Sequence, residues 1–314
     1  MITLKEAEFD VSAINENITG AGVLPIAKHN GKIYCLLGKE RFINHWRGSL
    51  KWSGFEGGRK PNEKIEYTAA REFVEECIGI VKIDGKSITI DSVLQFILEK
   101  RYFAKIVICI CHNDFSEKRY HVTYVIEVDY QHIEEEFQAE RKRLIDLNNK
   151  SNQVNKLYAD LFENKDLIVE SKTTLNGQRI NAVTNVSFID NRFCIEFVNI
   201  DNRTSKVIHH DLDDHICVQY IRWFCLRKEL TDNTNLMNRY ISLGAIEVER
   251  NCIGATVDVT LNEDYLEKQA IKWWSLSELK NVFKNGGFLN NEFFRAYFLP
   301  VLQTTIKEIE MYEE

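Results

Sequence analysis

Residues 57–80, GGRKPNEKIEYTAAREFVEECIGI, contain the densest pattern in this chain of 314 residues. Apolar side chains recur there at positions i, i+3, i+4 and i+7, namely Ala70, Phe73, Val74 and Cys77. This spacing gathers them on one stripe of a helix, which a core would cover. Gly79 is suited to cap the C-terminal end. The stretch therefore predicts an amphipathic helix over residues 65–78, entered through a loop rich in Gly and basic residues.

Three glutamates share one face of the predicted helix. Glu72, Glu75 and Glu76 lie at i, i+3 and i+4, so their carboxylates project together beside the apolar stripe. Clustered like charges cost free energy unless cations neutralise them, and Arg71 neutralises only one. Hard oxygen ligands favour Mg²⁺ or Mn²⁺ over zinc. One interpretation of the cluster is a site for a divalent metal. The alternative is a solvated acidic helix face, which would be the better interpretation of an isolated cluster.

The cluster belongs to a longer pattern, Gly-x5-Glu-x7-Arg-Glu-x2-Glu-Glu. Its members are Gly57, Glu63, Arg71, Glu72, Glu75 and Glu76. Six fixed residues at this spacing arise by chance on the order of once in ten thousand chains or less. At these residues the chain resembles the Nudix hydrolases, a family of α/β enzymes that cut diphosphate linkages with a divalent metal.

The resemblance implies a role for each residue of the motif. Metal binding falls on three glutamates, Glu72, Glu75 and Glu76. Catalysis is implied for Glu75 and Glu76, and a structural role for Gly57, Glu63 and Arg71, which hold the loop and aim the carboxylates. In the family the pattern continues Glu-Glu-x-Gly, whereas here Glu76 is followed by Cys-Ile-Gly, one residue too many. We expect this to shift the end of the helix without moving the carboxylates.

The resemblance extends beyond the motif, over about residues 20–130 and 266–305. Near the C-terminus, residues 271–279 read IKWWSLSEL and are similar to the family's last strand and the helix that follows it. In some members a glutamate before that strand binds metal or acts as general base, which makes Glu267 the best-spaced candidate here and Glu263 the second. Four basic residues flank the presumed cleft and are candidates to grip substrate phosphates: Lys39, Arg41, Lys51 and Arg59.

Periodicity elsewhere predicts the remaining elements. A β-hairpin is expected from Gly22–Ala27 and Lys32–Leu37 around a His-Asn-Gly turn. Strands are expected at Ser87–Leu98, Lys105–Cys111, His121–Val128, Ala182–Ile189, Phe193–Asn199 and Ser205–His209. Residues 132–165 look helical, residues 216–227 fit a strand or a buried helix, and the chain should end in a strand and two helices. The fold class is therefore α/β, a Nudix-type mixed sheet sandwiched between helices, with residues 1–130 and 266–314 as the hydrolase domain and 131–265 as a large inserted module.

Composition narrows the class of protein. The chain is 44% hydrophobic with a net charge of −7 and a pI near 5.7, which disfavours a globally basic nucleic-acid-binding protein. No run reaches the roughly 18 apolar residues of a membrane span, and the N-terminus lacks the pattern of a signal peptide. The eight cysteines form no C-x-x-C pair, as in proteins with reduced, buried thiols. We expect a cytoplasmic protein that contacts neither membrane nor DNA.

Weaker features lie in or near the insertion. Residues 141–143, Arg-Lys-Arg, are able to contact phosphate, but more often such a run is a solvated helix face. The histidines and aspartates at 209–215, His209, His210, His215, Asp211, Asp213 and Asp214, match no zinc pattern, so a polar turn is the better interpretation. Two tryptophan pairs, Trp46/Trp52 and Trp273/Trp274, would suit stacking on a base, although tryptophans are more often core residues.

Three functional hypotheses follow. The first is an mRNA-decapping enzyme, because the large insertion would supply an RNA-binding surface and the layout is similar to that of viral decapping Nudix enzymes. The second is an enzyme for small nucleotide-type substrates such as ADP-ribose, dinucleoside polyphosphates or inositol pyrophosphates. The third is an inactive Nudix-fold sensor of a ligand, which the intact motif disfavours.

Overall fold

The computed structural model describes residues 2–5, 17–111, 118–162, 180–189, 192–199, 205–210, 214–250 and 257–313. The chain divides into two units, Met1–Arg141 with Glu263–Glu314, and Lys142–Asn262. All residues of the motif at 57–76 belong to the first unit. The assignment of a hydrolase domain to 1–130 and 266–314 stays a prediction.

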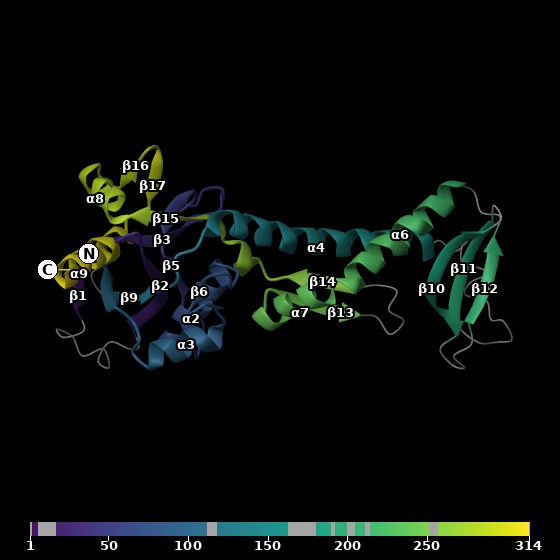
Figure 1. Ribbon diagram of the computed structural model, residues 1–314, viewed down its shortest axis with the longest axis horizontal. Coiled ribbons are helices and arrows are strands. Elements are labelled where there is room, and N and C mark those ends of the chain that lie inside the picture. The colour runs from purple at the N-terminus through teal and green to yellow at the C-terminus, as the bar shows by residue number, and fades with distance from the viewer. Residues whose placement is uncertain are drawn as a thin grey trace. The chain divides into compact units, whose positions relative to one another are not determined.

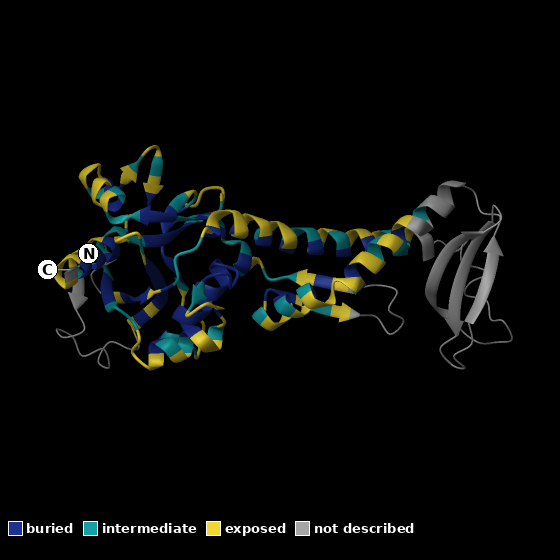
Figure 2. Ribbon diagram, viewed as in Figure 1, coloured by how far each residue is buried: buried dark blue, intermediate teal, exposed yellow. Residues whose placement is uncertain are grey.

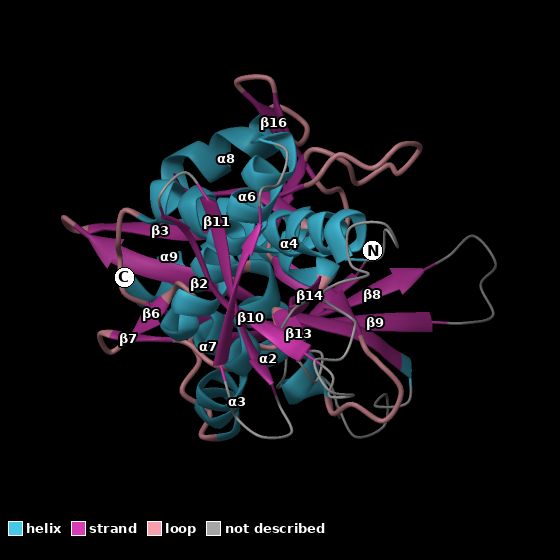
Figure 3. Ribbon diagram, turned by 90° about the vertical axis from the view of Figure 1, so that its right-hand side faces the viewer, coloured by secondary structure: helices cyan, strands magenta, loops and turns pink. Residues whose placement is uncertain are grey.

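One mixed sheet forms the centre of the first unit (Figure 1). Among the described residues it has ten strands, eight of which follow the order β1-β8-β9-β2-β3-β4-β17-β16. These are β1 (Ile2–Lys5), β2 (Ile18–His29), β3 (Lys32–Glu40), β4 (Lys51–Ser53), β8 (Ala104–Cys111), β9 (Lys118–Glu127), β16 (Phe288–Leu289) and β17 (Glu292–Phe294). Two more strands, β5 (Phe55–Gly58) and β15 (Lys268–Ser275), pair with β2 and β3. The pairs β2–β9 and β4–β17 are parallel and the others are antiparallel, as in the long β8–β9 ribbon of Figure 3.

Helices cover both faces of this sheet. Leu24 and Ile26 of β2 pack into a core with residues of α8 (Leu276–Lys284) and α9 (Leu299–Glu313). Side chains alternate along a strand, so Val23 points to the opposite face, where α2 (Ile65–Glu76) packs against β2 and β5. The central strands β2 and β3 and helix α2 are accordingly mostly buried (Figure 2). Mixed α/β architecture, with a large mixed sheet flanked by helices, is therefore the fold class of the protein.

Most of the expected elements of the first unit are present. The hairpin of β2 and β3 turns through Asn30 and Gly31, whose φ angles of 50° and 72° suit a two-residue turn. The expected helix at 65–78 is α2, and the expected strands at 105–111 and 121–128 are β8 and β9. The expected C-terminal strand and helices are β15, α8 and α9.

The strand predicted at Ser87–Leu98 was wrong. Ser87 ends the short hairpin of β6 (Lys82–Ile83) and β7 (Lys86–Ser87), and the rest forms helix α3 (Ile90–Leu98). Thr89 and Ser92 cap α3 reciprocally: the Thr89 N–H donates to Ser92 Oγ at 2.8 Å, and the Ser92 N–H donates to Thr89 Oγ1 at 3.2 Å. Val93 and Ile97, four residues apart, are its buried positions. The β-branched residues suggested a strand, but the cap and this spacing favour the helix.

Helix α4 (Ile133–Phe162) begins in the first unit and continues into the second. It corresponds to the helix expected over 132–165. Besides the later part of α4, the second unit contains the antiparallel sheet β10 (Ile180–Ile189), β11 (Arg192–Asn199) and β12 (Ser205–His210), helices α6 (Asp214–Asp232) and α7 (Thr234–Leu243), and the hairpin β13 (Ile246–Arg250) and β14 (Val257–Leu261). Residues 216–227, for which strand and helix were both open, are helical. No helix in the described part of the chain is long and apolar enough to cross a bilayer.

Candidate active site

Helix α2 presents its glutamates to the end of β5. Glu72, Glu75 and Glu76 are buried, with 7%, 5% and 2% of their surfaces exposed. Gly57 in β5 lies so close to Glu72 that a Cβ atom at position 57 would come within 2.4 Å of its carboxylate. The glycine of the motif is therefore needed to leave room for this carboxylate.

Arg71 ties the loop before α2 to the helix. Its Nε and Nη2 donate to the two oxygens of Glu63 at 2.8 and 3.0 Å, and Nη2 also donates to the Gly58 carbonyl at 3.0 Å. Its Nη1 lies 2.7 Å from Glu72 Oε1 and 2.8 Å from Glu75 Oε2. The structure thus brings Glu63 and Arg71 together, with Glu72 and Glu75 as further partners of the guanidinium.

Glu76 is held by groups from two other elements. Its Oε2 accepts a 2.8 Å hydrogen bond from the Glu56 N–H, and its Oε1 lies 3.0 Å from Lys268 Nζ. The same ammonium donates to Glu40 Oε1 at 2.7 Å and to Ser53 Oγ at 3.0 Å. Strands β3, β4, β5 and β15 therefore all contribute to the surroundings of Glu76.

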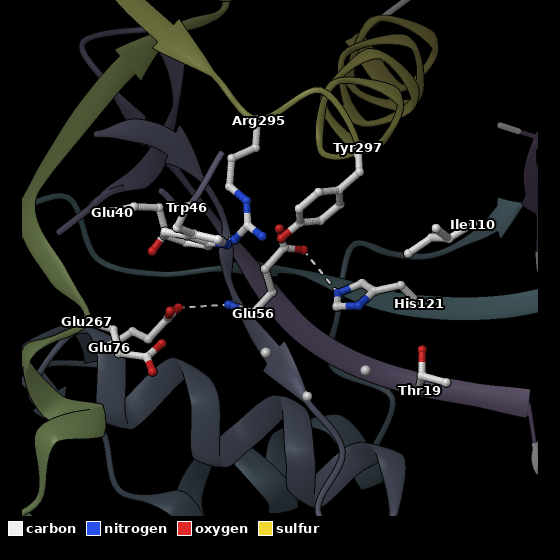
Figure 4. Close-up of a pocket in the computed structure, with 13 residues that line it drawn as sticks. Thr19, Glu40, Trp46, Glu56, Glu76, Ile110, His121, Glu267, Arg295 and Tyr297 are labelled. Atoms are coloured by element: carbon white, nitrogen blue, oxygen red, sulfur yellow. Dashed lines mark hydrogen bonds and ion pairs between the residues drawn. The ribbon is translucent and has the colours of Figure 1, made fainter. Parts of the chain in front are cut away.

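A pocket of about 350 Å³ opens beside this network. Charged and polar side chains from distant parts of the chain line it, including Glu40, Glu56, Glu76, His121, Glu267, Arg295 and Tyr297 (Figure 4). Glu56 Oε2 lies 3.0 Å from His121 Nε2. The Arg295 guanidinium lies 4.3 Å from the Tyr297 ring and 5.1 Å from the Trp46 ring, and Nη1 donates to Glu40 at 2.8 Å. The pocket thus combines carboxylates with one positioned guanidinium.

Burial makes several of these carboxylates hard to ionise. It raises the pKa of Glu72 to about 7, although Arg71 opposes the shift, and Glu75 adds repulsion. It raises the pKa of Glu76 well above the usual range despite Lys268, and also raises the pKa values of Glu75 and Glu267. Glu56 differs: burial would raise its pKa, but His121, Arg295 and Tyr297 together lower it.

The donor set fits a divalent cation by its charge. Five glutamates around the site are buried among the described residues, Glu40, Glu56, Glu72, Glu75 and Glu76. Three cations, Arg71, Lys268 and Arg295, face them. Within the described ranges, no three His, Cys, Asp or Glu side chains are already spaced to share one ion. A cation would therefore have to draw carboxylates together, and it would relieve their uncompensated charge.

Of the two glutamates suggested near the last strand, only Glu267 lines the pocket. Its carbonyl accepts a 2.8 Å hydrogen bond from the Arg41 N–H just before β15 begins. Glu263 lies apart from the pocket lining, and its exposed carboxylate is 3.3 Å from Arg41 Nη1. The geometry thus favours Glu267 over Glu263.

The four basic residues suggested to grip phosphates do not line this pocket. Lys39 is 2.7 Å from Glu292, Arg41 pairs with Glu263, and Arg59 donates to the Glu63 carbonyl at 2.6 Å. Lys51 is half-buried at the start of β4. Their substrate-binding role stays a prediction, and the cation that lines the pocket is Arg295.

The two tryptophan pairs suggested from the sequence, Trp46/Trp52 and Trp273/Trp274, separate into two groups. Trp46 is 37% exposed and lines the pocket. Trp52 and Trp274 are core residues whose rings meet edge to face at 5.4 Å, and Trp273 is buried against Tyr130 at 5.2 Å. Only Trp46 is therefore placed to meet a ligand in the pocket.

None of the three basic residues at 141–143 lines the pocket. Arg141 Nε donates to the Lys268 carbonyl at 3.2 Å, and Lys142 pairs with Asp146 along α4. The side chains of the His and Asp residues at 209–215 lie outside the described residues.

Several residues of the site were not found from the sequence: Glu40, Glu56, His121, Lys268, Arg295 and Tyr297. A charged residue within a short buried strand, such as Glu56 in FEGG, was a usable signal, because buried carboxylates need a partner. His121 lies within the continuously buried part of β9, residues 120–126, and carried a similar signal. For Arg295 and Tyr297 no local pattern separates them from other residues near the chain end.

No family model matches the chain, and no curated protein matches it. Among solved structures, it is similar to an Ap4A hydrolase from C. elegans, with 16% identity over 36% of this chain and 67% of that chain, at a TM-score of 0.25. It is also similar to RenU, a Nudix hydrolase from M. smegmatis, with 14% identity over 37% and 63% of the two chains (TM-score 0.25). A third is the NUDIX domain of NrtR from Shewanella oneidensis, complexed with ADP ribose, with 15% identity over 41% and 73% (TM-score 0.23). TM-scores this low carry no weight for activity, so the chemistry of the site has to be derived from this chain's own residues.

Proposed function

We propose that this chain is a Nudix-type hydrolase that uses Mg²⁺ or Mn²⁺ to cleave a diphosphate linkage in a nucleotide-type substrate. The observation that carries the proposal is the excess of buried carboxylates over cations around α2, where Glu40, Glu56 and Glu76 line the pocket and Glu72 and Glu75 lie on the helix beside it. Buried carboxylates without matching positive charge are costly for folding alone, so a functional reason for them is needed.

The oxygen-only donor set supports magnesium or manganese. Glu72, Glu75 and Glu76 are the proposed ligands. Arg71 Nη1 lies 2.7 Å from Glu72 Oε1 and 2.8 Å from Glu75 Oε2, so a cation would compete with this guanidinium for both carboxylates. A bound divalent ion would polarise phosphoryl oxygens, lower the pKa of a bound water and stabilise the leaving phosphate.

Glu267 is the proposed proton acceptor. Glu75 and Glu76, on helix α2, are the alternatives. The oxygen of water forms a new bond to one phosphorus, the bridging P–O bond breaks, and the electron pair of that bond stays on the leaving phosphate. The proton of the water passes to the carboxylate. Burial raises the pKa of Glu267, which makes it a stronger base than an exposed glutamate.

Arg295 is the proposed phosphate-binding group. Its guanidinium lines the pocket and lies between the rings of Trp46 and Tyr297. Among the hydrogen bonds of the described residues, the guanidinium makes one to Glu40, through Nη1. Guanidinium groups carry several N–H donors in one plane, which match phosphate oxygens. The pocket thus has a carboxylate end for the cation and a guanidinium for the substrate.

The 5′ cap of mRNA is the substrate we put first, with ADP-ribose, dinucleoside polyphosphates and inositol pyrophosphates as alternatives. The position of Trp46 at the pocket supports a planar base as part of the substrate. An inositol pyrophosphate lacks such a base and would not use this ring.

The test is a hydrolysis panel with capped RNA, ADP-ribose, Ap4A and an inositol pyrophosphate, each with Mg²⁺ and with Mn²⁺. Mass spectrometry in ¹⁸O-labelled water identifies the phosphorus that is attacked. Methylated GDP released from capped RNA would support decapping, and cleavage of free nucleotides alone would support the small-molecule alternative. Tight binding without hydrolysis of any compound would instead support a ligand sensor.

A further inference from the structure

Lys268 is the most deeply buried cation near the site. Its side chain is 0% exposed, and its ammonium contacts three oxygens: Glu40 Oε1 at 2.7 Å, Ser53 Oγ at 3.0 Å and Glu76 Oε1 at 3.0 Å. An ammonium has three N–H donors, so these contacts use all of them. Lys268 therefore makes a complete set of hydrogen bonds and ion pairs without any solvent.

The backbone around Lys268 is shaped to admit it. In the β15–β3 pairing Lys268 lies opposite Glu40, and the register shifts between Lys268 and Ala270. A Cβ atom on Gly38 would come within 2.8–2.9 Å of three stem carbons of Lys268. A side chain at position 38 would thus displace the lysine, so the glycine makes the channel for its stem.

The consequence of this arrangement falls on Glu76. Its Oε2 is held by the Glu56 N–H at 2.8 Å and its Oε1 by Lys268. With one partner on each oxygen, the plane of the carboxylate cannot turn, while each oxygen keeps a further lone pair. Second partners of this kind orient metal ligands and raise metal affinity.

We infer that Lys268 is a positioning residue that fixes the Glu76 carboxylate in the orientation that binds the divalent cation. This inference rests on the proposed function, since it requires Glu76 to be a metal ligand. The competing role is that of a plain counterion, which would occupy Glu76 and weaken cation binding. The two roles predict opposite effects on metal affinity when the ammonium is removed.

The experiment is a titration of the Lys268→Met variant with Mn²⁺. Binding is measured in two ways, by calorimetry and by the electron paramagnetic resonance signal of unbound Mn²⁺. Methionine keeps an unbranched stem of similar length without the charge. The positioning role predicts that Lys268→Met binds Mn²⁺ at least about tenfold more weakly. Losing a hydrogen-bond partner of a metal ligand typically lowers metal affinity by this factor. The matched control is Lys280→Met, which removes a half-exposed lysine paired with Glu310 and should leave Mn²⁺ affinity unchanged. Unchanged or tighter binding by Lys268→Met would overturn the inference.

Gly38→Ala is the second variant, because Lys268→Met removes the ammonium that pairs with two buried carboxylates, Glu40 and Glu76, and can fail to fold. It keeps every charge and only displaces the lysine stem. We expect Mn²⁺ binding several-fold weaker with a folded thermal melt, and unchanged affinity would again overturn the inference. Wild-type protein that binds Mn²⁺ but cleaves no diphosphate would remove the proposed function and leave these affinities to decide the role of Lys268. Wild-type protein that binds no Mn²⁺ would overturn both.

Discussion

The guanidinium of Arg71 contacts the carboxylates of Glu63, Glu72 and Glu75 at once, at distances from 2.7 to 3.0 Å. A lysine keeps the charge but cannot reach these groups together, because its donors spread from one nitrogen. Arg71→Lys should therefore lower the free energy of unfolding by about 2 kcal/mol in urea denaturation. The control is Arg101→Lys, whose half-exposed side chain pairs with Asp84 on the surface, with a cost below about 0.5 kcal/mol. Equal effects of the two substitutions would contradict the role given to Arg71.

Glu72 makes the stability of the metal-free protein depend on pH. Burial raises its pKa from 4.5 to about 7, so the folded state holds the proton more tightly than the unfolded chain. The stabilisation is complete below pH 4.5 and is lost as the pH rises through 7. The melting temperature of the protein in a chelator should therefore decrease as the pH rises from 5 to 8, and added Mg²⁺ should raise it again. The melting temperature of Glu72→Gln should depend less steeply on pH. A slope of melting temperature against pH equal to that of the wild type would contradict the role of Glu72.

Arg295 gives a prediction about substrate binding. Arg295→Met removes the guanidinium that lines the pocket and should lower kcat/KM for a diphosphate substrate by about 10- to 100-fold, since a hydrogen bond to a charged group contributes about 1.5–3 kcal/mol. Arg101→Met is the matched control, because Arg101 also stacks on a ring, 4.1 Å from Phe96, and pairs with a carboxylate. Steady-state kinetics at saturating Mg²⁺ measures both. A loss no larger than that of the control would remove Arg295 from the substrate site.

At the scale of the element, α2 ends in an unusual turn. Two consecutive residues after the C-cap, Ile78 and Gly79, have φ angles of 55° and 61°, and the Gly79 N–H donates to the Val74 carbonyl at 3.0 Å. This turn absorbs the additional residue between Glu76 and Gly79, so the helix ends at Glu76. A β-branched residue at positive φ costs about 1–2 kcal/mol.

That strain reverses the usual order of two substitutions. Ile78→Ala and Ile78→Gly both lose the buried side chain, but only glycine relieves the backbone, so Ile78→Gly should be the more stable by about 1 kcal/mol. Inside the helix, Val74→Ala should be more stable than Val74→Gly by about the same amount. Chemical denaturation of the four variants measures this difference. The same order at both positions would mean that Ile78 is not strained.

The sequence predicted α2 well because its information is local. A helical period of apolar residues and a fixed spacing of Glu63, Arg71 and the three glutamates lie within twenty residues, and contacts in the structure follow that spacing. The strand predicted at 87–98 was wrong because its β-branched composition favours a strand, whereas the Thr89–Ser92 cap and the spacing of the buried residues Val93 and Ile97 favour the helix.

At the scale of the whole molecule, the residues of the site that the sequence did not predict are those that the pairing of strands in the sheet brings together. Glu40, Glu56, His121 and Lys268 come from four strands whose neighbours are far apart in sequence, including the parallel pairing of β2 with β9 and the pairing of β15 with β3. Propensity and periodicity carry no information about which strands pair. The sequence therefore predicts the helix that carries the carboxylates but not the groups that surround them.

The central claim is that the glutamates of α2 support metal-dependent hydrolysis. The most direct measurement is the turnover of the best substrate of the panel, with Mg²⁺, by wild-type protein and by the double variant Glu75→Gln, Glu76→Gln, with a thermal melt of each. Wild-type protein should hydrolyse the substrate, and the folded double variant should not. A folded double variant with wild-type turnover would contradict the central claim.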